Sequence, residues 1–174
     1  PEYFGRMEAL AKDSGATIMF GVGSSRHAPE SWRPWMGMID RVSDGGGRMF
    51  AQVHSRQFNI VLNFEGQLPF DGLPEWKALR ARPRAEQIAA LRDPETRAKL
   101  VHEAHHGEYG NAVGAEARKP DYDWVLVMGD PLGPHERVSD LAKARGVDPV
   151  ELMIDLALET DFAQNFLQPF ANEV

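Results

Sequence analysis

Apolar residues recur along the first third of the chain with spacings that predict helices and strands in alternation. Residues 4–11 carry their apolar side chains on one helical face, and residues 16–22 form an apolar run that ends in a Gly-Ser loop. Residues 30–43 return to helical spacing, and residues 48–54 predict a second strand. A helix between two short strands is typical of a βαβ unit, so we expect these strands to pair in parallel.

The rest of the chain is less regular, but turn and cap residues still divide it. Asp93-Pro94 and Asp148-Pro149 each predict a helix start, because Asp caps a helix and Pro fits its first position. Gly146 predicts a helix end. The further elements that we predict are helices over residues 84–91, 138–145 and 148–158, a helix from residue 93, and a third strand over residues 122–128.

This order of elements favours an α/β fold, and specifically part of a larger barrel. Three parallel strands would leave two open edges and little sheet for the helices to cover. We therefore predict a partial (β/α)8 TIM-type barrel, with residues 1–174 as one segment from its middle-to-late part and no separate second domain. The chain starts at Pro1 without an initiator Met or a signal peptide, which predicts an internal piece of a larger protein.

Composition narrows the class of protein. Hydrophobic residues make up 43% and charged residues 26%, as in an ordinary globular chain, and the net charge of −7 argues against a nucleic-acid binder. No apolar run approaches the roughly 18 residues of a membrane span, so we expect no membrane partner. The chain has no cysteine, which excludes disulfides and thiolate metal sites and fits a cytoplasmic protein.

Two segments resemble the metal-dependent amidohydrolases, in the D-aminoacylase (N-acyl-D-amino-acid deacylase) branch. Residues 138–152, VSDLAKARGVDPVEL, look like the family's helix–Gly–Asp-Pro–helix element, and residues 32–62 look like the stretch that crosses two central strands. The resemblance implies hydrolysis of an amide C–N bond in an N-acyl amino acid or a similar small molecule. It also implies Zn²⁺ or another divalent metal in the full-length enzyme.

The family's catalytic signatures are absent from this chain. The sequence contains no His-x-His pair and no Ser-Asp-x-Gly-Ala-His element. The resemblance therefore implies that these residues work together with the remainder of their own polypeptide. It also implies that the isolated chain is inactive and that this segment need not bind the metal by itself.

Four residues are candidates for the site. His54 closes the second strand, where barrel enzymes place catalytic residues, so we predict a catalytic residue or a metal ligand there. Arg56 could pair with a substrate carboxylate, and Ser24 could donate a hydrogen bond to substrate. His27, in the loop after the first strand, is a second metal-ligand candidate. Each has a structural alternative: a strand-closing polar group, a surface ion pair or a loop residue.

A separate motif points to different chemistry. Residues 102–106, HEAHH, match H-E-x-x-H, which in zinc proteases supplies two metal ligands and a general base. Gly107 ends the helix at once, so a polar helix end is the simpler interpretation. Three hypotheses follow: an amidohydrolase segment, a non-catalytic barrel-like interaction module, and a zinc protease. Association into a homo-oligomer is left open.

Overall fold

The chain folds as an α/β protein in the computed structural model, which describes residues 2–110 and 118–171. The α/β class predicted from the sequence is confirmed. The described residues divide into two compact units, one drawn from residues 1–59 with 169–174 and the other from residues 60–168. The prediction that all 174 residues belong to one barrel segment stays a prediction.

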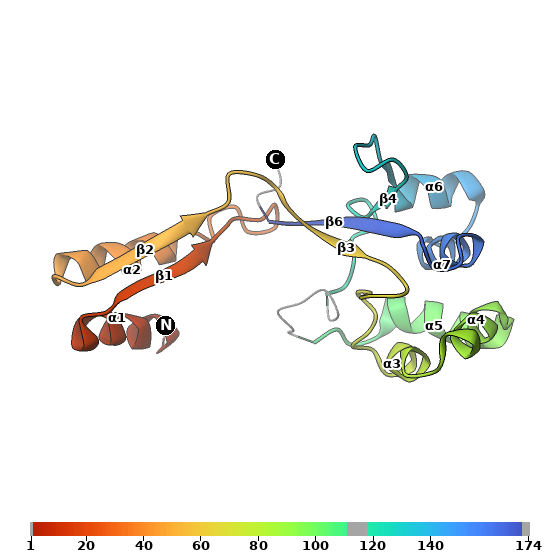
Figure 1. Ribbon diagram of the computed structural model, residues 1–174, viewed down its shortest axis with the longest axis horizontal. Coiled ribbons are helices and arrows are strands. Elements are labelled where there is room, and N and C mark those ends of the chain that lie inside the picture. The colour runs from red at the N-terminus through yellow and green to blue at the C-terminus, as the bar shows by residue number, and fades with distance from the viewer. Residues whose placement is uncertain (1, 111–117, 172–174) are drawn as a thin grey trace. The chain divides into compact units, whose positions relative to one another are not determined.

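The first unit is built on a parallel pair of strands (Figure 1). It contains the helices α1 (Glu2–Ser14) and α2 (Arg33–Asp44) and the strands β1 (Thr17–Val22) and β2 (Arg48–Val53). The strands pair in parallel, in a register that runs from Thr17 opposite Arg48 to Val22 opposite Val53. The βαβ unit predicted from residues 16–54 is therefore confirmed.

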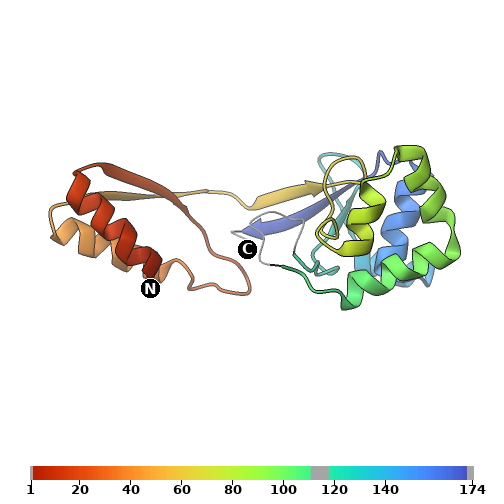
Figure 2. The same ribbon diagram turned by 90° about the horizontal axis from the view of Figure 1, so that it is seen from below.

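Both helices of this unit cover the same face of the strand pair (Figure 2). Their shared core is Ala11, Met38, Val42 and Met49, which are all buried, and Phe4 and Trp35 pack beside it edge to face. The opposite face carries Met19 and Phe50, which face each other in the register and are 59% and 52% exposed. Among the described residues, α1 and α2 thus cover one face of the parallel pair, and Met19 and Phe50 are exposed on the other.

The second unit holds five helices among its described residues, and their bounds largely agree with the cap signals. Asp93 accepts a hydrogen bond from the Thr96 N–H, and Asp148 accepts one from the Val150 N–H, so both predicted caps are confirmed. Gly146 lies in the left-handed region with φ +68°, as a helix-ending glycine should. The helices are α3 (Pro74–Arg80), α4 (Arg84–Arg92), α5 (Pro94–His106), α6 (Val138–Arg145) and α7 (Pro149–Glu159).

The prediction of a third parallel strand is wrong. Residues 122–128 yield only the short strand β4 (Leu126–Met128), which pairs antiparallel with both of its neighbours, β5 (Glu136–Arg137) and β6 (Asn165–Ala171). The chain reverses after α7 through a turn in which Asp161 and Phe162 have positive φ, and β6 then runs against β4. With β3 (Phe58–Leu62), these strands form a sheet of order β3-β6-β4-β5.

Two phenylalanines near the end of the chain, Phe162 and Phe166, serve core packing. Phe162 and Phe166 are buried in the core of the second unit, together with Phe64, Phe70 and Trp76. The side chains that these phenylalanines pack against belong to this chain.

Neither sheet closes on itself among the described residues. No described helix is long and apolar enough to cross a bilayer.

Candidate functional site

A small cleft lies at the carboxyl ends of the two parallel strands, where ligands bind in open and closed parallel α/β sheets. Its volume is about 230 Å³. The β1–β2 register brings Val22 level with Val53, so the loop after β1 and the end of β2 meet there. The first turns of α2 supply the remaining wall. The lining residues are Val22, Gly23, Ser24, Trp32, Met36 and Val53.

The predicted site residues lie in or close to this cleft. Ser24 lines it and is half-buried. His54 directly follows the lining residue Val53, is exposed, and places its ring 5.6 Å from that of Phe58. Arg56 is exposed two residues further along the chain. His27 lies in the turn that the Ser25–Ala28 bridge closes, and it is not among the residues that line the cleft.

Two residues of this cleft had no place in the predicted site. Trp32 and Met36 come from the start of α2 and line the cleft beside Ser24 with apolar side chains. Trp32 sits at the cap position of α2, before Pro34, and the Arg33 guanidinium lies 4.8 Å from its ring. A helix that begins directly after a strand-end loop carries its first side chains to the strand end, and this was the signal available in the sequence.

The cleft does not by itself supply a metal site. Within residues 2–110 and 118–171, no group of three or more His, Asp or Glu side chains is placed to hold a metal ion. His54 would therefore be a single ligand from this segment. The metal that the amidohydrolase resemblance implies does not fit the described residues alone, and no catalytic step is derived through it.

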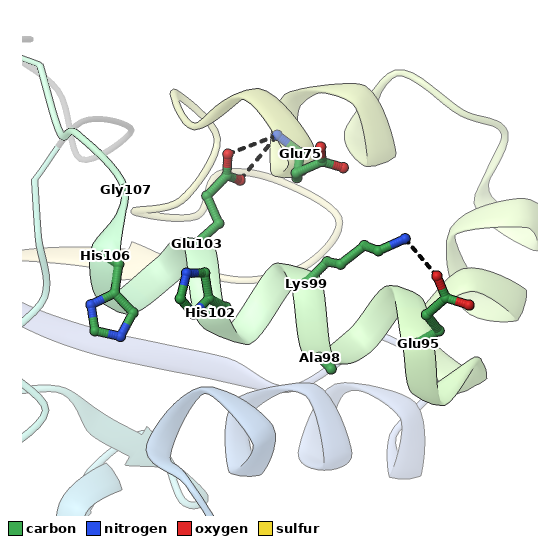
Figure 3. Close-up of a pocket in the computed structure, with 8 residues that line it drawn as sticks. All are labelled: Glu75, Glu95, Ala98, Lys99, His102, Glu103, His106 and Gly107. Carbon is green, nitrogen blue, oxygen red and sulfur yellow. Dashed lines mark hydrogen bonds and ion pairs between the residues drawn. The ribbon is translucent and has the colours of Figure 1, made fainter.

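The H-E-x-x-H motif occupies the last turn and a half of α5, beside a larger cleft of about 630 Å³ (Figure 3). His102 and His106 lie one helical turn apart and are exposed, and their ring centroids are 4.6 Å from each other. Glu103, between them in sequence, turns to the start of α3. Its carboxylate accepts hydrogen bonds from the N–H groups of Glu75, at 3.0 and 3.1 Å, and Trp76, at 3.3 Å.

This bonding gives Glu103 a structural task. Helix α3 begins after Leu73, which has no side chain able to cap it, and Pro74 takes its first position. The Glu103 carboxylate supplies the missing acceptor and adds a negative charge where the helix dipole favours one. A general base needs its carboxylate directed at a metal-bound water. The observed bonding therefore does not support the zinc-protease hypothesis.

The third histidine of the motif region belongs to a different cluster. His105 Nε2 lies 2.7 Å from Asp148 Oδ2, and the His105 ring packs edge to face against Tyr122 at 6.0 Å. Burial raises the pKa of Tyr122 well above its ordinary value and has the same effect on the pKa of Tyr109. The Tyr122 hydroxyl is buried without a hydrogen-bond partner among the described residues.

Asp130, which lies two residues after the end of β4, acts as a turn former. Its side chain accepts a hydrogen bond from the Leu132 N–H at 2.8 Å, and its carbonyl accepts one from the Gly133 N–H at 2.9 Å. This is the routine role of Asp before Pro.

Comparison of the chain with protein-family models, with curated proteins and with solved structures finds no match.

Proposed function

We propose that this chain is part of a (β/α)-barrel amidohydrolase of the D-aminoacylase type, which hydrolyses the amide bond of an N-acyl amino acid or a similar small molecule. The observation that carries the proposal is the parallel β1–β2 pair with a cleft at its carboxyl end. Ser24 lines that cleft, and His54 directly follows the lining residue Val53 in the chain. Barrel enzymes build their sites at this end of their strands.

The arrangement of the helices supports a barrel in place of a finished two-stranded sheet. In a barrel all helices lie outside, and α1 and α2 cover the same face of the pair. The other face exposes Met19 and Phe50, although parallel sheets are almost always covered on both faces. Each strand of the pair also keeps one edge without a strand partner among the described residues. Further barrel strands would occupy those edges and enclose that face.

The proposal assigns roles to residues of this segment only. His54 contacts the reacting amide or a metal ion there, Arg56 pairs with the substrate carboxylate, and Ser24 donates a hydrogen bond to substrate. The resemblance places the remaining ligands in other parts of the barrel. A non-catalytic barrel-like module would share the same fold, so amide hydrolysis and bound metal separate the two hypotheses.

The test uses the natural polypeptide that contains residues 1–174. Purified protein is incubated with N-acetyl-D-amino acids and with their L enantiomers, and release of the free amine is followed with and without a chelator. The proposal expects metal-dependent release from at least one class of substrate. If neither enantiomer nor any other amide is hydrolysed, and the protein retains no divalent metal, the non-catalytic module replaces the proposal.

A further inference from the structure

The exposed histidine pair on α5 has the spacing of a chelating site. His102 and His106 lie four residues apart on one helix, which puts both imidazoles on the same face. Their ring centroids are 4.6 Å apart, and Figure 3 shows both side chains beside the cleft. Imidazole is the commonest protein ligand for transition metals. Two imidazoles one turn apart can therefore reach a single ion.

The charges around the pair favour a cation. Three carboxylates line the cleft, from Glu75, Glu95 and Glu103, against the single ammonium of Lys99. That ammonium is bonded to Glu95 at 2.7 Å, so it is directed along α5 (Figure 3). Three negative charges and one positive leave a formal excess of two negative charges. A cleft lined mainly by one sign of charge raises the local concentration of the opposite ion.

The neighbouring polar groups have other partners. Glu103 is bonded to the start of α3, and His105 is bonded to Asp148. No third His, Asp or Glu completes a metal site with the pair among the residues that the structure describes. We infer that His102 and His106 form a two-imidazole site for a divalent transition metal, with Cu²⁺ bound more tightly than Ni²⁺ or Zn²⁺, and that this site does not hydrolyse peptides. The order of affinities is that of nitrogen ligands in general.

This inference does not rest on the amidohydrolase proposal, and the chain suits a direct test. It has no cysteine, so thiolates cannot compete for the metal. CuCl₂ and ZnCl₂ are titrated into the full chain by calorimetry, and the Cu²⁺ complex is examined by electron paramagnetic resonance. We expect one Cu²⁺ site whose spectrum reports two nitrogen ligands.

Substitutions separate a chelating pair from scattered surface binding. His102→Ala and His106→Ala should each weaken Cu²⁺ binding by at least the roughly 10- to 100-fold that loss of an outer-shell partner costs, and should leave one nitrogen in the spectrum. Both side chains are exposed, so neither change should unfold the helix. His135→Gln, at a half-buried histidine outside the cleft, is the control and should leave Cu²⁺ affinity unchanged.

Glu103→Gln distinguishes a carboxylate ligand from a nearby charge. Because Glu103 is bonded to α3, this change should lower Cu²⁺ affinity far less than loss of either histidine. The inference is overturned if the double variant His102→Ala/His106→Ala binds Cu²⁺ as the parent does, or if the spectrum reports a single nitrogen. It is also overturned if Glu103→Gln abolishes binding, or if the Cu²⁺- or Zn²⁺-loaded chain cleaves peptides.

Discussion

Replacement of Glu103 by alanine is expected to destabilise the second unit by removing the acceptor at the start of α3. The carboxylate is within 3.0–3.3 Å of the N–H groups of Glu75 and Trp76, and no residue of α3 itself replaces it. Loss of a helix cap costs about 0.5–2 kcal/mol, and the charge at the helix start contributes about 0.3–1 kcal/mol more. The expected loss in the free energy of unfolding is therefore about 1–3 kcal/mol.

The assay is urea unfolding followed by tryptophan fluorescence, which includes the buried Trp76. For a chain of this length, each kcal/mol lost corresponds to a fall of about 2–4 °C in the thermal midpoint. Glu103→Gln keeps an oxygen acceptor but loses the charge. Its urea and thermal unfolding midpoints should therefore both lie between those of the parent and Glu103→Ala.

The matched control is Glu95→Ala, a change at another carboxylate on the same helix and cleft. Glu95 pairs with Lys99 in solvent, and exposed pairs of this kind contribute little to stability. If Glu103→Ala unfolds at the same urea concentration as Glu95→Ala, Glu103 does not cap α3. A protease base would behave in the opposite way, since Glu103→Gln would abolish peptide hydrolysis and leave stability unchanged.

Three further predictions concern the second unit. Tyr122→Phe should leave the free energy of unfolding unchanged or raise it by up to about 1–3 kcal/mol, because the hydroxyl is buried without a hydrogen-bond partner among the described residues. A clear loss of stability in urea unfolding would show that the hydroxyl has such a partner. The raised pKa values of Tyr109 and Tyr122 mean that the folded chain keeps protons that the unfolded chain releases above its ordinary tyrosine pKa of 10.0. The stability contribution of these two tyrosines is therefore fully present below pH 10, and the free energy of unfolding should fall as the pH rises above 10. In urea unfolding at pH 9 and pH 11, Tyr122→Phe should show a smaller fall between the two pH values than the parent. Gly146→Ala should cost about 1–2 kcal/mol, since φ is +68° there, and an unchanged thermal midpoint would contradict the left-handed helix end.

Short sequence signals predicted the helix starts, a helix end and the parallel strand pair, because each of these depends on residues that are close together in the chain. The caps at Asp93 and Asp148 and the glycine at residue 146 are read from a few neighbouring residues, and the structure agrees with each. The β1–β2 pairing also follows locally, because a short helix links two apolar strands.

The antiparallel direction of the strands in the second half of the chain depends on contacts between residues that are far apart in sequence. β4 pairs with β6, about forty residues later, and the phenylalanine spacing of four around β6 matches a helix as well as a core strand. The role of Glu103 was hidden for the same reason, since its partners Glu75 and Trp76 lie 28 and 27 residues away. The motif spacing alone could not show which way its carboxylate turns.

The most direct test of the proposed site is the effect of His54→Ala on amide hydrolysis by the natural polypeptide that contains these residues. His135→Gln is the control, because His135 lies outside the cleft at the ends of β1 and β2. A positioned acid, base or ligand contributes about 100-fold or more to the rate, so kcat/KM for N-acyl amino acids should fall by at least that factor in His54→Ala and stay unchanged in the control. Equal kcat/KM values for the parent and His54→Ala would contradict the assignment of the active site to the carboxyl ends of β1 and β2.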